Sequence, residues 1–133
     1  MKKITILLFL TIGIHSITIA QNKTTNQIAI DENSICHKWI FSDVINPKFT
    51  KKELEETKAL LEGIFIEIRK DKTCLTSLVL ELEGTWTLNL EEKYIIIEDE
   101  RGSVKWKIHS LTKNEIQLSR NDAKQIIVFK TTN

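Results

Sequence analysis

The sequence predicts an all-β fold, an eight-stranded antiparallel up-and-down barrel with one short helix between strands 1 and 2. The prediction rests on two observations: most segments after residue 63 alternate apolar and polar residues, and most turns between them are short. Parallel neighbours need crossovers of a dozen residues or more, and only the helical connection is that long. An open sheet would leave two edges and a wide apolar face in water, which closure into a barrel removes. A two-sheet sandwich is the alternative, but its crossings need longer connections.

Residues 1–20 have the layout of a secretory signal peptide. Lys2 and Lys3 precede a mostly apolar run over 4–14, and the small residues Ser16, Thr18 and Ala20 predict cleavage after Ala20. The run is marginal for a membrane span of about 20 apolar residues, so we expect no span in the mature chain. No cysteine lies at the junction, which argues against a lipoprotein. We therefore expect an exported protein, periplasmic or secreted, with a flexible leader over 21–34 and a barrel domain over 35–133.

The first strand is expected over 37–45, where Trp39 and Phe41 supply apolar bulk. Asn46-Pro47 then marks a turn. Thr50 and Glu53 form a capping-box pattern before a helix over 51–62, and Gly63 is the expected stop. The helix follows the first strand directly, so its apolar side is expected to cover the barrel mouth there, as a fixed stopper or a lid. The apolar residues of that side are Leu54, Leu61 and Ile64.

The remaining segments alternate or are rich in branched residues, as strands are. Glu83-Gly84 is expected to end the third strand, in which Leu78, Leu80 and Leu82 share one face. The cleanest alternation sets Val104, Trp106 and Ile108 against Lys105, Lys107 and His109. The expected strands after the helix cover 64–68, 74–82, 85–90, 94–97, 104–109, 115–119 and 125–130.

Length and composition bound the function. The chain has 133 residues, 41% apolar and 28% charged, which suits a single globular domain. The formal charge of +1 is too balanced for a strongly basic nucleic-acid binder. Trp106 also faces away from Lys105 and Lys107, so stacking and phosphate contact would fall on different faces. We therefore expect no nucleic-acid partner, and the sequence names no protein partner.

A catalytic or metal site is not expected. His37 and His109 lack metal-ligand spacing, and no nucleophile or phosphate-loop motif is present. The acidic clusters at 91–92 and 98–100 lie in expected turns, where solvent keeps carboxylates ionised. We expect no enzyme activity and no cofactor. Export would permit a disulfide between Cys36 and Cys74, with two separate thiols as the alternative.

The tryptophans point inward by strand phase and allow two interpretations. They can fill an eight-stranded barrel, which is only just wide enough for side chains. Alternatively, a cavity remains and takes a small hydrophobic molecule without catalysis. We adopt ligand binding as the hypothesis, with a filled barrel acting as a protein-interaction or envelope-associated module as the alternative. The expected ligand-binding residues are Trp39, Ile66, Leu80, Trp86, Leu88, Trp106, Ile108 and Phe129.

A set of short motifs lies along the predicted strands and turns: Lys38-Trp39, Lys70-Asp71-Lys72-Thr73, Gly84-Thr85-Trp86, the run over 103–108, Leu111-Thr112 and Val128-Phe129-Lys130. In their order and spacing, they resemble the small bacterial lipocalin-like proteins over residues 35–131. The resemblance implies an eight-stranded up-and-down barrel and, more weakly, a bound ligand. Two departures are His37 and Lys72, which stand where that family usually has glycine. The second departure predicts a less tight turn between the second and third strands.

Overall fold

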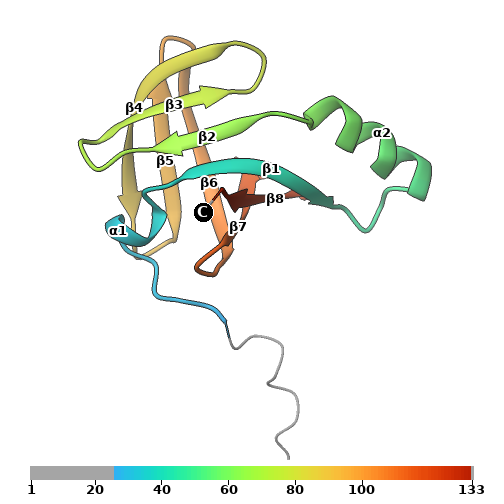
Figure 1. The fold of residues 1–133 in the computed structure, drawn as a ribbon, viewed down its shortest axis with the longest axis horizontal. Coiled ribbons are helices and arrows are strands. Elements are labelled where there is room, and N and C mark those ends of the chain that lie inside the picture. The colour runs from blue at the N-terminus through green and yellow to red at the C-terminus, as the bar shows by residue number, and fades with distance from the viewer. Residues whose placement is uncertain (1–25, 133) are drawn as a thin grey trace, which may run out of the picture.

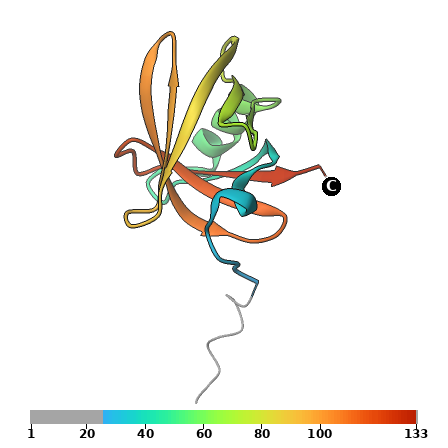
Figure 2. The same cartoon turned by 90° about the vertical axis from the view of Figure 1, so that its left-hand side faces the viewer.

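The computed structural model describes residues 26–132, and its eight strands form a closed antiparallel barrel (Figure 1 and, turned by 90°, Figure 2). Each strand pairs with the next along the chain, and the last pairs with the first from Trp39 opposite Thr131 to Ile45 opposite Ile126. The predicted fold class is thereby confirmed. The signal peptide expected over 1–20 lies outside the described residues. The elements are α1 (Glu32–Ile35), β1 (Lys38–Ile45), α2 (Lys51–Leu61), β2 (Phe65–Ile68), β3 (Thr73–Ser77), β4 (Glu81–Asn89), β5 (Tyr94–Asp99), β6 (Gly102–Leu111), β7 (Glu115–Arg120) and β8 (Ile126–Thr131).

The part of the N-terminal segment that the structure describes packs on the barrel, which corrects the expectation of a flexible leader there. The backbone N–H of Ile28 donates to the carbonyl of Leu111 at 2.9 Å. Asp31 caps α1 by accepting from the N–H of Ser34 at 2.7 Å. Ile35, at the end of this short helix, is fully buried. A single helical turn has no hydrophobic period, so the sequence pattern did not indicate it.

The predicted break at Glu83-Gly84 was wrong. The chain bends at residues 78–80 instead, and β4 runs straight through Gly84. Glycine is needed there because β5 passes very close: an added Cβ would lie 2.4 Å from the carbonyl oxygen of Glu98. Gly84 therefore marks a close approach of two strands and not a turn.

The turn between β2 and β3 is tight despite Lys72, which corrects the expectation of a looser one. Lys72 adopts φ 74°, in the left-handed region that glycine enters without steric cost. Its N–H donates to the carbonyl of Arg69 at 3.2 Å. The lysine ammonium lies 4.4 Å from the ring centre of Trp86 and pairs with Glu32. These contacts offset part of the strain.

The helix α2 forms as predicted but does not close the barrel mouth. Its capping box is present, with the Thr50 hydroxyl accepting from the Glu53 N–H at 3.1 Å. However, no residue of α2 is buried, and Leu60 is 83% exposed. Figure 1 shows the helix extending away from the strands, beyond the end of β1. An ion pair of 3.0 Å between Lys58 and Asp43 ties it to β1. Leu61, at the end of the helix, is partly buried against the core, and Ile64 just after it is buried, so the helix borders the mouth without covering it.

Candidate functional site

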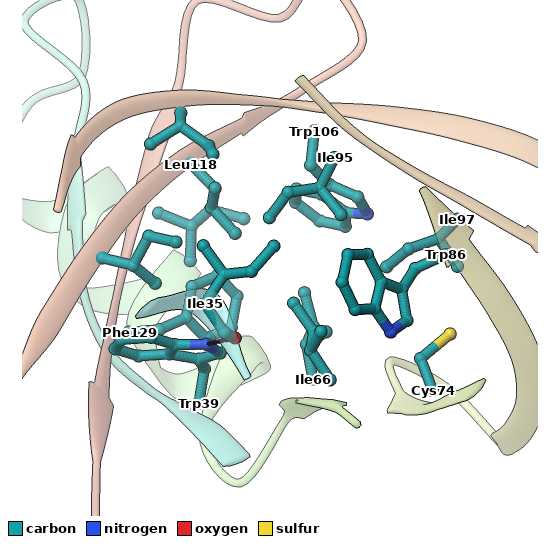
Figure 3. Close-up of a cluster of buried hydrophobic side chains, with 14 of the residues drawn as sticks. Ile35, Trp39, Ile66, Cys74, Trp86, Ile95, Ile97, Trp106, Leu118 and Phe129 are labelled. Carbon is teal, nitrogen blue, oxygen red and sulfur yellow. Dashed lines mark hydrogen bonds between the residues drawn. The ribbon is translucent and has the colours of Figure 1, made fainter. Parts of the chain in front are cut away.

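The three tryptophans lie inside the barrel, as strand phase predicted. Trp39, Trp86 and Trp106 are 0%, 2% and 2% exposed. Figure 3 shows these indoles facing a shared centre with Phe129 and Ile66. The Trp106 and Phe129 rings pack edge to face, with a ring-centre distance of 6.4 Å and an interplanar angle of 84°. Such edge-to-face packing adds to the apolar burial that stabilises a core.

One end of the barrel is closed by α1 and the β2–β3 turn. The indole N–H of Trp39 donates to the carbonyl of Ile35 at 2.9 Å, the hydrogen bond dashed in Figure 3. The indole N–H of Trp86 donates to the carbonyl of Arg69 in the turn at 2.7 Å. Both polar edges are thus satisfied by backbone that covers this end. This end is therefore closed by α1, an element that the sequence pattern did not indicate.

A mostly apolar pocket of about 350 Å³ lies at the other end of the barrel, which we call the mouth pocket. It lies between the end of α2, the bend after β3 and the turn between β7 and β8. Its volume falls in the range of about 300–1,000 Å³ that small-molecule sites occupy. Trp106 and Ile127 belong both to its wall and to the core. The lining residues are Leu61, Ile64, Leu78, Val79, Trp106, Arg120, Ala123, Gln125 and Ile127.

The structure separates the residues predicted to bind a ligand. Among them only Trp106 lines the mouth pocket. Leu88 is half-buried against the core. Leu80 lies on the bend after β3, 64% exposed, and the prediction that it faces the interior was wrong because that strand ends at Ser77. The others belong to one buried hydrophobic cluster: Trp39, Ile66, Trp86, Ile108 and Phe129.

Sequence reasoning placed Leu61 and Ile64 at the barrel mouth and Trp106 inside, and it missed the rest of the pocket lining. Alternation nevertheless held a signal for some of the missed residues. Ile116 and Leu118 are buried on β7, and Arg120 is the next residue with the same phase. Leu78 likewise follows the buried Cys74 and Thr76 of β3. Gln125 and Ile127 share the alternation phase of the buried Phe129, whereas Ala123 lies in a turn and carries no period.

Arg120 differs from the other two arginines in its surroundings. Arg69 pairs with Glu67 and Glu83, each at 3.1 Å, and Arg101 pairs with Asp99 at 3.1 Å. Within residues 26–132, no carboxylate lies within ion-pair distance of the Arg120 side chain. The hydrogen bond from Arg101 is the main cause that holds the pKa of Asp99 below its usual value, and the charge of Arg120 adds to it. Arg120 is therefore a solvated cation at the edge of an apolar pocket.

Cys36 and Cys74 are free thiols, so the candidate disulfide is not formed. The strand β2 separates them: Cys74 lies opposite Ile68, whose N–H donates to the carbonyl of His37 on the far side. Two strand spacings amount to about 9–10 Å between backbones, beyond the roughly 7 Å that a disulfide can span. Burial raises the pKa of the Cys74 thiol to about 11 and also raises that of Cys36. Neither is poised as a nucleophile.

The remaining polar candidates lie on the surface. His109 is exposed on β6, and its Nε2 lies 2.7 Å from the Ser119 hydroxyl. Burial lowers the pKa of His109, and the nearby charge of Lys107 lowers it further. Glu91 and Glu92 are exposed in the turn between β4 and β5. Across residues 26–132, no three His, Cys, Asp or Glu side chains are grouped as metal ligands would be.

The described helices also include none with the length and apolarity needed to cross a membrane. No protein-family model matches the chain, and no curated protein does. A solved structure of a DUF4847 family protein from Bacteroides vulgatus ATCC 8482 is similar, with a TM-score of 0.52. The alignment covers 71% of this chain and 92% of that protein at 16% sequence identity. The chain therefore shares the fold of a DUF4847 family protein.

Proposed function

We propose that this protein is an exported, lipocalin-like barrel that binds a small apolar molecule without catalysis, in the mouth pocket. The proposal rests on the mouth pocket itself, which has a volume of about 350 Å³ and is lined mainly by Leu, Ile, Val and Trp side chains. Covering such a surface contributes roughly 25 cal/mol per Å² of apolar area removed from water. We therefore place the ligand at the mouth of the barrel, next to Trp106, whereas the sequence had suggested a site among all three tryptophans in the interior.

Export is supported by the signal-peptide layout of residues 1–20. Its cleavage would remove two lysines and no acid, leaving 17 basic residues of the original 19 against 18 acidic ones. We expect the mature chain to begin at Gln21. N-terminal sequencing of the protein from the extracytoplasmic fraction tests this, and an intact Met1 in that fraction contradicts it.

A protein-interaction role is the second candidate, and exposed apolar side chains favour it. Leu60, Val79 and Leu80 are 83%, 88% and 64% exposed. Large side chains exposed together often mark an interaction site. Here they come from α2 and from the bend after β3, the two segments that border the mouth pocket. A partner on this surface would compete with a ligand for the same entrance.

Binding of a neutral fluorescent apolar probe, N-phenyl-1-naphthylamine, tests the first candidate. We expect saturable one-to-one binding with a change in tryptophan emission, since Trp106 lines the pocket. Ala123→Trp fills the pocket from an exposed turn and should weaken binding at least tenfold. Ala59→Trp, on the exposed surface of α2, is the matched control and should leave it unchanged. Absence of binding, or equal binding by both variants, contradicts the proposal.

A further inference from the structure

We infer that the mouth pocket selects an amphiphile with one anionic head and one apolar chain, with the head paired to Arg120. This inference rests on the proposed function and specifies its ligand. It starts from the position of Arg120, the last residue of β7, which shares the phase of the buried Ile116 and Leu118. An inward position at the end of a strand places the guanidinium at the mouth, where solvent reaches it.

Within residues 26–132 no ion pair neutralises Arg120, although its charge acts on Asp99 from beyond ion-pair distance. Arg69 and Arg101 are held by carboxylates, whereas Arg120 has no such partner in the described part of the chain. Asp99, whose pKa Arg120 helps to lower, already accepts from Arg101 at 3.1 Å, and its side chain is only 5% exposed. The Asp99 carboxylate is therefore already paired and largely covered, whereas the Arg120 side chain is exposed.

The hydrogen-bonding geometry of the Arg120 guanidinium indicates which head group the ligand carries. Its planar donors match a carboxylate or phosphate in a two-point hydrogen bond, which a neutral hydroxyl cannot reproduce. Gln125 also lines the pocket and offers an amide donor. Because Arg120 is exposed, the anion would stay in contact with water at the rim. No buried charge has to be created, so the large cost of desolvating an ion is avoided.

The apolar chain is defined by the rest of the lining. Ile64, Trp106 and Ile127 lie where the wall of the pocket meets the core. A chain running from Arg120 over these side chains would remove apolar surface on both partners from water. Each added methylene that fits should tighten binding about fourfold, until the pocket is full.

The test compares ligands that differ only in the head. Octanoate, decanoate and dodecanoate are titrated against the matching primary alcohols by calorimetry, with tryptophan fluorescence as a second readout. We expect the carboxylate to bind about tenfold more tightly than its alcohol at low salt, as a hydrogen bond to a charged group implies. Dodecyl sulfate and dodecyl phosphate separate a preference for carboxylate from a preference for any anionic head. Dodecyltrimethylammonium reverses the charge.

Arg120→Gln should reduce the preference for carboxylate over alcohol to nearly one while leaving alcohol binding intact. Lys124→Gln removes the same charge from the adjacent turn and should keep the preference. Circular dichroism confirms that both variants are folded. Equal binding of carboxylate and alcohol by the wild type, an unchanged preference in Arg120→Gln, or tighter binding of the cationic amphiphile overturns the inference. In those cases alcohol binding still supports the proposed function, whereas failure of every amphiphile and of the neutral probe rejects both.

Discussion

The indole N–H of Trp86 donates a 2.7 Å hydrogen bond to the backbone carbonyl of Arg69, which joins the middle of β4 to the β2–β3 turn. Lys72 reinforces the link, because its carbonyl accepts from the backbone N–H of Trp86 at 3.0 Å. The Trp86 side chain therefore fills the core and also anchors the β2–β3 turn. Two hydrogen bonds from Trp86, one from the indole and one from the backbone, hold the turn at the closed end of the barrel.

We predict that Trp86→Phe costs about 2 kcal/mol of unfolding free energy or more. The change removes buried volume and leaves the Arg69 carbonyl without its donor. Trp106→Phe is the matched control, since it makes the same change without that hydrogen bond and should cost about 1 kcal/mol. Urea unfolding followed by circular dichroism measures both. Equal losses in the two variants would show that the hydrogen bond contributes nothing.

Replacing Lys72 by glycine and by alanine should separate backbone strain from side-chain contacts. Both changes remove the contacts with Glu32 and Trp86, but only glycine enters φ 74° freely. We expect Lys72→Gly to be more stable than Lys72→Ala by about 1 kcal/mol. Thermal unfolding midpoints report the difference. A more stable alanine variant would mean that the turn relaxes out of the left-handed region.

The thiol of Cys36 should react with an alkylating reagent before the thiol of Cys74. Cys36 is half-buried and Cys74 is buried with its pKa raised to about 11, so the Cys74 thiolate is scarce near pH 8. We expect iodoacetamide to label Cys36 slowly in the native protein and Cys74 only after denaturation. Mass spectrometry without a reductant should then find two labels per chain. Unlabelled, denatured protein would instead reveal a disulfide.

His109 should make stability fall on acidification. Burial lowers its pKa in the folded state below the ordinary value of 6.5. The unfolded chain therefore takes up a proton first as the pH falls, which favours unfolding. The contribution is complete above about pH 6.5 and is lost as the pH falls through the folded-state pKa. His109→Gln should flatten the pH dependence of urea midpoints between pH 7.5 and 5, and an unchanged slope would contradict this origin.

The sequence predicted the barrel because alternation and short turns are local signals of strands and antiparallel pairing. The capping box of Thr50 and Glu53 was equally local, and it is present. The bend at residues 78–80 was missed because Leu78 and Leu80 continue the apolar period through it. Gly84 was misread because its role depends on the approach of Glu98, which lies fourteen residues away and is set by pairing of β4 with β5.

The candidate site was less predictable than the core. Inward phase identified Trp39, Trp86 and Trp106 correctly, but phase does not tell how deep along the barrel a residue lies. The mouth pocket gathers residues from α2 and the segment after it, the β3 bend, β6, the end of β7, the β7–β8 turn and β8. Strand tilt and register bring these segments together, and neither property is written in any single stretch of sequence.

Closure of the sheet by β1 and β8 has a consequence for biosynthesis. The partner of β1 along Trp39–Ile45 follows every other strand in the chain, so a nascent polypeptide carries two open edges until residues 126–131 have left the ribosome. Such distant pairing gives a high contact order and slow folding. Stalled or shortened products would therefore be the species most prone to aggregate edge to edge.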